Sequence, residues 1–158
     1  MSKLLSISAE DTDGLQPTRA DIGARGEQLA ADYLEHNGYL LILSNFKVPI
    51  GRNTRGVSVT GEIDIVAVDN DTLCFVEVKT RISDAFAEPL ANVTARKQRQ
   101  ITRTSRVYRR IFQLSHMPYR FDVVSLVLAP RTEPRIELIK DFWSESKFRK
   151  RVWNGDIY

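Results

Sequence analysis

The alternation of hydrophobic and polar positions predicts a helix and then a strand in the first part of the chain. Residues 1–17 are polar and acidic without a period, and we expect them to form a disordered tail. Apolar side chains then recur at helical spacing over Thr18–Asn37, where Thr18 and Asp21 are placed as a capping box and Gly38 as a stop. The apolar run Tyr39–Phe46 predicts a strand.

The segment Val48–Thr60 breaks this pattern. Pro49, Gly51 and Gly56 interrupt it, and it has no regular run of apolar side chains. These features favour a long loop or a flexible hairpin that leads into a strand starting near Gly61.

Two apolar runs, IDIVAV and LCFVEV, flank the turn-like sequence DNDT and predict a β-hairpin. A tight turn centred between Asn70 and Asp71 places Asp64 opposite Glu77, and Glu62 opposite Lys79. A three-residue loop would shift this register by one position. Because side chains alternate along a strand, Glu77 and Lys79 share one face, and the register brings Asp64 to it.

The second half of the chain predicts a helix over Thr94–Gln113 and strands over Arg120–Ala129 and Arg135–Lys140. The resulting order of elements predicts an α/β fold with a mixed central β-sheet flanked by helices. We expect one domain over residues 18–141, followed by a C-terminal tail over residues 142–158.

Composition narrows the class of protein. The chain has 158 residues, of which 42% are hydrophobic and 27% charged, as in an ordinary globular domain. A single cysteine excludes an internal disulfide, and the two histidines lie far apart without metal-ligand spacing. No apolar run approaches the about 18 residues of a membrane span, and the start lacks a signal-peptide core, so we expect no membrane contact and a cytoplasmic protein.

The predicted hairpin raises a chemical question, because it places carboxylates inside apolar runs. Asp64 and Glu77 face each other, and two such carboxylates repel unless a cation lies between them. A hard divalent ion such as Mg²⁺ suits a site of oxygen ligands, and Lys79 beside it could orient a water or stabilise charge on a phosphate. The alternative is that Lys79 bridges the two acids in a structural salt network.

Glu27 is a further candidate for this site. It follows Gly23 and Gly26 on the predicted first helix, and small residues allow the helix backbone to approach the sheet closely. Its carboxylate could then lie beside Asp64 and Glu77. The alternative is an ordinary solvated helix acid.

The predicted second helix is strongly basic. Residues 95–110 contain seven bases and no acid, and the apolar positions lie on the opposite side from a stripe of arginines. Arginine suits phosphate because its guanidinium donates two parallel hydrogen bonds, so nucleic acid is the expected partner; a merely solvated face is the alternative. The candidate nucleic-acid-binding residues are Arg96, Arg99, Arg103, Arg106 and Arg110, with Arg52 and Arg55 from the preceding interrupted segment.

Four sequence segments together resemble a known family. The segments GARGEQLAADYLEHNGYLLILSNF, GEIDIVAVDNDTLCFVEVKTR, VTARKQRQ and RFDVV are similar to the bacterial YraN-like family, which is related to archaeal Holliday-junction resolvases in the PD-(D/E)XK nuclease superfamily. The resemblance implies a restriction-endonuclease-like core and a phosphodiesterase centre that uses Mg²⁺ or Mn²⁺. It places the metal ligands at Asp64 and Glu77, and the catalytic set at Glu27, Asp64, Glu77 and Lys79.

The expected function is therefore a metal-dependent endonuclease that acts on DNA, including branched or structured DNA. The resemblance to resolvases also implies a homodimer. Three alternatives remain at this point: a non-catalytic nucleic-acid-binding protein with a nuclease fold, a metal-dependent hydrolase of a small phosphorylated molecule, and a structural adaptor.

Overall fold

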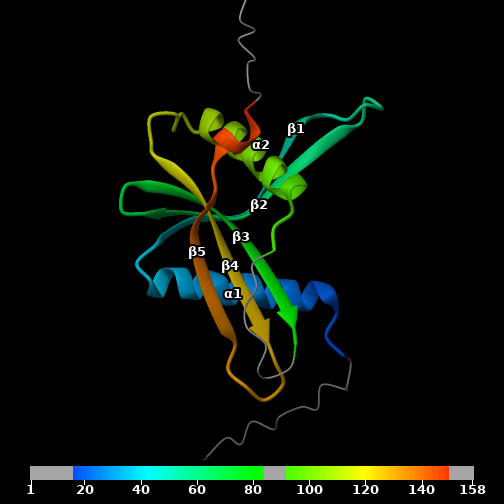
Figure 1. Cartoon of the computed structure of the whole chain (residues 1–158), viewed down its shortest axis with the longest axis vertical. Helices are drawn as coiled ribbons and strands as arrows, with labels where there is room; N and C mark the ends of the chain where they lie inside the picture. The colour runs from blue at the N-terminus through cyan, green and yellow to red at the C-terminus, as the bar shows by residue number, and fades with distance from the viewer. Residues whose placement is uncertain (1–15, 84–91, 150–158) are drawn as a thin grey trace, which may run out of the picture.

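A single mixed sheet organises the computed structural model, which describes residues 16–83 and 92–149 (Figure 1). Its strand order is β1-β2-β3-β4-β5, with β3 and β4 parallel and every other neighbouring pair antiparallel. This arrangement, with helices against the sheet, confirms the predicted α/β fold class. The strands are β1 (Leu40–Arg52), β2 (Ser58–Asp69), β3 (Thr72–Ile82), β4 (Tyr119–Leu128) and β5 (Arg135–Trp143).

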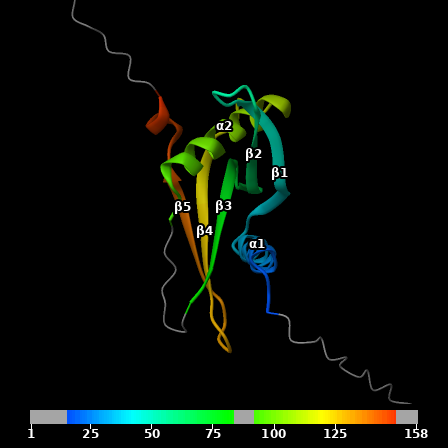
Figure 2. The same cartoon turned by 90° about the vertical axis from the view of Figure 1, so that its right-hand side faces the viewer.

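The two long helices pack on opposite faces of the sheet (Figure 2). Helix α1 (Arg19–His36) begins at Thr18, whose side chain forms the predicted capping box with Asp21. Helix α2 (Ala95–Ile111) begins at Thr94, whose hydroxyl accepts a hydrogen bond from the backbone N–H of Lys97. None of these described helices is long and apolar enough to cross a membrane.

Each face of the sheet has its own hydrophobic core. Under α1, Ala30 and Leu34 pack on Val76 and Val124, together with neighbouring apolar side chains. Under α2, the core includes Ile101, Tyr108, Phe75 and Phe121. Strands β3 and β4 are covered on both sides, which explains why their sequences read as nearly continuous apolar runs.

The predicted register of the β2–β3 hairpin is correct. The ladder runs from Asp69–Thr72 at the turn to Ile65–Val76, and then it ends. Beyond that point β2 continues beside β1 alone, where Glu62 pairs with Lys47 rather than opposing Lys79 as expected. The sheet therefore splits between β2 and β3 immediately next to Asp64.

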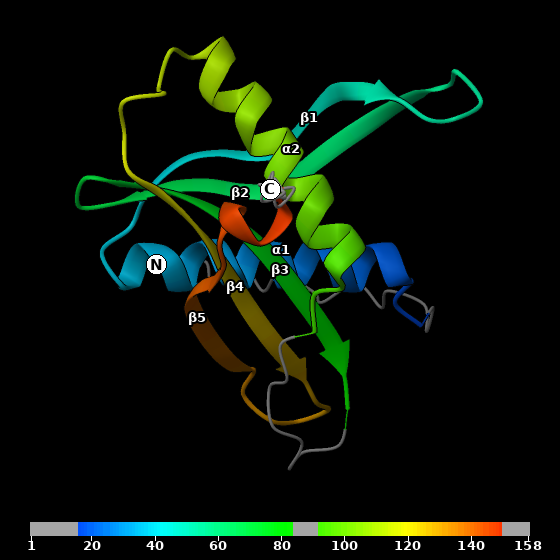
Figure 3. The ribbon, with the colours of Figure 1, turned by 45° about the horizontal axis from the view of Figure 1, so that its top comes forward.

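The segment Val48–Thr60 forms a β-ribbon, so of the two expected conformations the structure has the hairpin. Strand β1 continues to Arg52 and β2 starts at Ser58, and the ribbon extends beyond the sheet (Figures 1 and 3). Pro49 is tolerated because β1 is an edge strand, and the register shifts between Pro49 and Gly51. Gly51 and Gly56 both adopt positive φ angles, which the turn and the shift require.

The chain after β5 folds back onto α2. Trp143 is buried, stacks on Phe121 with ring centroids 4.7 Å apart, and donates its indole N–H to Thr102. The short 3₁₀ helix η1 (Glu145–Phe148) follows and lies beside α2 (Figure 3). Part of the predicted C-terminal tail is thus packed on the domain, while residues 1–15, 84–91 and 150–158 lie outside the described residues.

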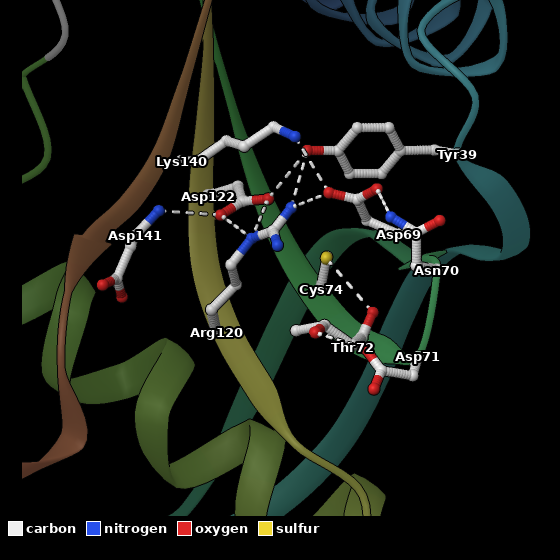
Figure 4. Close-up of polar contacts among 10 residues, drawn as sticks. All are labelled: Tyr39, Asp69, Asn70, Asp71, Thr72, Cys74, Arg120, Asp122, Lys140 and Asp141. Carbon is white, nitrogen blue, oxygen red and sulfur yellow. Dashed lines mark hydrogen bonds and ion pairs between the residues drawn. The ribbon is translucent and has the colours of Figure 1, made fainter.

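A polar network ties the ends of several strands together (Figure 4). Arg120 on β4 donates to both oxygens of Asp122 (2.9 and 3.0 Å), to Asp69 (2.6 Å) and to the hydroxyl of Tyr39 (2.9 Å). Lys140 on β5 also binds Asp69, at 2.9 Å. The pairing of Asp122 with Arg120, rather than a role in the catalytic site, agrees with their two-residue spacing on one strand.

The single cysteine lies next to this network. Cys74 is fully buried, and its thiol contacts the carbonyl of Thr72. Burial, together with the nearby Asp122 carboxylate, raises the pKa of the Cys74 thiol to about 12. The thiol is therefore protonated and shielded in the folded protein.

Candidate active site and basic surface

Asp64 lies where β2 and β3 separate. Its Oδ2 atom accepts a hydrogen bond of 2.8 Å from the backbone N–H of Val78, in the place where a regular ladder would have continued. The side-chain carboxylate thus accepts the hydrogen bond that a backbone carbonyl of β2 would accept in a regular ladder, and this contact holds it against β3. The strand separation is what allows a polar side chain to reach this partly buried position.

Glu77 is the most buried acid of the predicted site, with an exposed fraction of 3%. Two lysines contact it: Lys79 lies 3.0 Å from its Oε1 atom and Lys97 of α2 lies 3.6 Å from its Oε2 atom. Oε2 is buried and receives no hydrogen bond from any described residue. Lys79 therefore pairs with Glu77 but does not bridge it to Asp64, because no lysine or arginine among the described residues forms an ion pair with Asp64.

The two acids interact electrostatically. Burial, reinforced by the charge of Glu77, raises the pKa of Asp64 to about 7, although the Val78 N–H and Lys97 act in the opposite direction. Glu27 adds a smaller contribution that also raises this pKa. The structure thus brings Asp64, Glu77 and Glu27 within mutual electrostatic reach, with negative charge that the nearby lysines do not fully balance.

Helix α1 brings Glu27 to the site through a close helix–sheet contact. Gly26 is buried, and a methyl group added there would overlap the side chain of Thr80 on β3. Gly23, by contrast, has no atom near the position of such a methyl group. The Glu27 carboxylate accepts a hydrogen bond of 3.1 Å from Asn45 on β1, which fixes its direction.

A cavity of about 450 Å³ adjoins these residues between α1 and β3. Its lining includes Glu27 and Lys79, together with Arg19 and Arg81. A second cavity of about 310 Å³ is also lined by Lys79 and Arg81, with Ser125 of β4. Lys79 therefore borders both cavities, whereas neither lining includes Asp64 or Glu77.

Asp64 and Glu77 are the two expected metal ligands. Within residues 16–83 and 92–149, no three or more His, Cys, Asp or Glu side chains gather in an arrangement that could hold a metal ion. A divalent cation held by Asp64 and Glu77 would need water for the rest of its coordination shell, as Mg²⁺ commonly accepts.

The predicted arginines fall into two groups on α2. All five stripe positions are exposed, but the Arg106 guanidinium binds Glu145 of η1. Arg96, Arg99 and Arg103 instead line a cavity of about 260 Å³ together with Arg52 of the β-ribbon. Arg55, in the turn of the ribbon, and Arg110, near the C-terminal end of α2, are exposed outside that lining.

Sequence reasoning missed one of the two side chains that contact the candidate site from outside the hairpin, Asn45. Asn45 orients Glu27 across 18 positions of sequence, and no local pattern in an edge strand points to it. Lys97, for which the resemblance to resolvases suggests a supporting role at the start of this helix, contacts Glu77 from the first turn of α2. Both contacts depend on how helices and sheet pack together.

Comparisons with known proteins identify the family of the chain. A structure of Hjc, a Holliday junction resolvase from Archaeoglobus fulgidus, is 23% identical, covers 78% of this chain and 89% of its own, and superposes with a TM-score of 0.39. A UPF0102 protein of Dehalococcoides mccartyi is 38% identical over 80% of this chain and 96% of its own length. Another, from Syntrophus aciditrophicus, is 43% identical over 75% of this chain and 85% of its own length. The model of the uncharacterised protein family UPF0102 matches residues 26–126, and the chain belongs to this family.

Proposed function

We propose that this protein is a divalent-metal-dependent endonuclease that acts on DNA, including branched or structured DNA. The observation that supports it most is the pair of carboxylates at the split between β2 and β3. Asp64 has a raised pKa, and Glu77 has a buried oxygen without a hydrogen bond. A purely structural salt network would be expected to satisfy both acids.

The residues of the site fit a divalent cation. Asp64 and Glu77 would hold the cation, and its charge would offset the repulsion that raises the Asp64 pKa. When bound, such an ion lowers the pKa of a coordinated water and neutralises charge on a phosphate. The expected ion is Mg²⁺ or Mn²⁺, because the available ligands are oxygens.

The remaining residues have distinct roles in this proposal. Asp64 is held by the Val78 N–H and Glu77 by Lys79 and Lys97, so both carboxylates are fixed before substrate binds. The Lys79 ammonium, whose side chain is 39% exposed, can hydrogen-bond the attacking water or stabilise negative charge on the phosphate. Glu27, oriented by Asn45, can accept a hydrogen bond from the same water.

The basic surface supports a polyanionic substrate. Nucleic-acid contact is proposed for the exposed arginines of α2 and the β-ribbon, because exposed guanidiniums bind phosphate oxygens in pairs. The proposed residues are Arg96, Arg99, Arg103, Arg106, Arg110, Arg52 and Arg55, with Arg106 first having to exchange Glu145 for phosphate.

Cleavage of labelled DNA tests the proposal directly. Duplex, single-stranded, flap and four-way-junction DNA would be incubated with the full chain and Mg²⁺ or Mn²⁺, beside an EDTA control. Cuts should appear with metal, disappear in EDTA, and disappear in Asp64→Asn and Glu77→Gln proteins. Asp71→Asn, an exposed acid at the tip of the β2–β3 turn, is the matched control and should cut normally. Metal-independent cutting, or cutting by Asp64→Asn, would refute the mechanism.

Thermal unfolding supplies a test that does not depend on activity. A cation that binds the folded state alone stabilises it, so Mn²⁺ should raise the midpoint of the wild-type protein in a concentration-dependent way. The same titration should leave the midpoint of Asp64→Asn nearly unchanged. Equal shifts in both proteins would place the metal elsewhere. DNA binding without cutting or metal binding would favour the non-catalytic alternative.

A further inference from the structure

The β-ribbon and α2 form the two walls of a basic pocket. Ile50, Arg52, Asn53 and Val59 line it from the ribbon, and Arg96, Arg99, Gln100 and Arg103 line it from the helix. The two walls lie side by side in Figures 1 and 3, where the ribbon of β1 and β2 runs next to α2. The pocket has a volume of about 260 Å³, large enough for a phosphodiester group and its water.

Specific contacts hold the two walls in this position. Arg103 donates 2.6 Å to the carbonyl of Ile50, and Gln100 donates 3.0 Å to the carbonyl of Thr60. Gly51 has a φ of 137°, and a methyl group there would lie 2.7 Å from the Arg103 guanidinium. Gly61 lets Thr104 approach β2 in the same way. These contacts between the ribbon and α2 therefore fix the shape of the pocket.

No carboxylate of residues 16–83 and 92–149 balances the charge of the pocket. Four guanidiniums line it, no acid does, and none of them forms an ion pair with a carboxylate of the described residues. The next arginines along α2 differ, because Arg106 and Arg109 both bind Glu145. Like charges gathered in one cavity repel, and an anion bound between them removes that cost.

We propose that this pocket holds backbone phosphates of the DNA strand that leads into the catalytic site. The inference deepens the proposed function and rests on it. Arg96 lines the pocket, and the adjacent Lys97 contacts Glu77. Helix α2 rises about 1.5 Å per residue, so Arg96 and Arg103 are separated by roughly 10 Å along it. That length corresponds to about three phosphates of one strand, at about 3.4 Å each along the duplex axis.

The proposal separates two tasks that a nuclease must perform. The arginine pocket anchors the strand beside the scissile bond, and Asp64 and Glu77 act on the bond itself. Binding through the pocket therefore requires no metal, whereas cleavage does. The pocket also requires the ribbon, since Arg52 comes from β1, and its guanidinium is steadied by the carbonyl of Gly56 at 2.6 Å.

Fluorescence anisotropy with a labelled DNA duplex in EDTA tests the pocket. The full chain would be compared with Arg96→Ala/Arg99→Ala, with Arg52→Ala, and with Arg25→Ala/Arg131→Ala. The last variant removes the same charge from exposed positions on α1 and at the β4–β5 turn. Circular dichroism and thermal midpoints would verify that each variant folds.

DNA binding by the pocket variants should be weaker than that of the wild type by roughly 10-fold or more at 100 mM salt. For the double variant, the slope of log K against log salt concentration should become shallower by about 2. The Arg25→Ala/Arg131→Ala protein should stay within about 2-fold of wild type. Equal loss in the pocket double variant and this control would overturn the pocket, because only net charge would then matter.

The outcome is distinguishable from failure of the proposed function. If the wild type binds through the pocket but never cuts, the anchoring site stands and the nuclease proposal fails. If the wild type cuts in a metal-dependent way and the pocket variants bind and cut normally, the nuclease stands and the pocket is overturned. Absence of duplex binding by the wild type would overturn the pocket as well.

Discussion

Two acidic side chains, Asp64 and Glu145, respond in opposite ways to their surroundings. Burial and the charge of Glu77 raise the pKa of Asp64 to about 7. Burial also disfavours the charge of Glu145, but hydrogen bonds from Tyr119 and Arg106 outweigh it, and the pKa of Glu145 lies below its ordinary value. The first carboxylate would gain from a bound cation, whereas the second is already stabilised by the fold.

The lowered pKa of Glu145 predicts a pH-dependent contribution to stability. A carboxylate whose pKa is lowered in the folded state stabilises the protein at pH values above its ordinary pKa of 4.5. This contribution is lost as the pH falls through the folded-state pKa. We expect Glu145→Gln to reduce the free energy of unfolding by about 1 kcal/mol at pH 7. The difference should close at a pH below the folded-state pKa, measured by urea unfolding at a series of pH values.

The control for this prediction is Glu35→Gln, which changes an exposed acid on α1. It should unfold like the wild type at every pH. A Glu145→Gln effect that persists unchanged in acid would show that the side chain acts through packing and not through its charge.

At the residue scale, the sequence predicts which side chains lie close together when they belong to one hairpin, and it does not predict contacts between distant segments. Asp64, Glu77 and Lys79 lie just beyond Ile65 and Val76, the last paired residues of one short-turn hairpin, so the sequence predicts that they lie near one another but not that the strands separate there. Glu145 lies 39 positions from Arg106, and their pairing depends on the path of the chain after β5. A contact of this kind leaves no periodic signal in the sequence.

At the scale of elements, the ribbon formed by β1 and β2 shows why the segment Val48–Thr60 was ambiguous. Proline and glycine usually end a strand, but Pro49 lies on the sheet edge, where its missing N–H costs no ladder bond. Contacts with α2, such as that between Arg103 and Ile50, then stabilise the extended form. The helices were predicted more closely, because caps such as Thr18 and Thr94 are local signals.

The packing of α1 on β3 predicts the effect of a single methyl group. Gly26→Ala should destabilise the protein by about 1–3 kcal/mol, because the added carbon overlaps Thr80 and the helix must move away from the sheet. Glu27 should move with it, so the proposed DNA cleavage should fall by more than the loss of folded protein explains. Urea unfolding and cleavage rates under native conditions would measure the two effects.

Gly23→Ala is the matched variant for stability. It lies on the same helix, but its added methyl group meets no atom within 4 Å, and alanine favours helix by about 1 kcal/mol relative to glycine. It should therefore be neutral or stabilising. If Gly26→Ala also stabilised the protein, α1 could not pack on β3 as closely as described.

At the scale of the whole molecule, the network around Arg120 connects chain segments that are distant in sequence. It joins the residue preceding β1, the β2–β3 hairpin, β4 and β5 (Figure 4). Asp122→Asn should lower the free energy of unfolding by roughly 1–3 kcal/mol, because the half-buried Arg120 guanidinium loses one of its two charged partners and keeps only Asp69. Asp71→Asn, at the exposed hairpin tip, should have little effect in the same urea titration. Equal effects would show that the network does not stabilise the fold.

The overall arrangement was predictable because each element carries its own pattern. Alternation, apolar runs and caps located the helices and strands, and their order predicted the mixed sheet. The sequence did not show that η1 packs against α2 and that Glu145 of η1 forms an ion pair with Arg106. A stripe of arginines has the same pattern whether or not a carboxylate pairs with one of them. Charge balance on a surface is a property of the assembled molecule.

The buried cysteine gives this fold an internal reporter. Cys74 is the only cysteine of the chain, and its thiol is sealed beneath α1 in the centre of the sheet. A thiol-specific reagent can modify it only when that region opens, so the labelling rate in native buffer reports how often the region opens. The proposed DNA substrate and metal ion can then be compared by how much each lowers this labelling rate, with no fluorophore or engineered residue added.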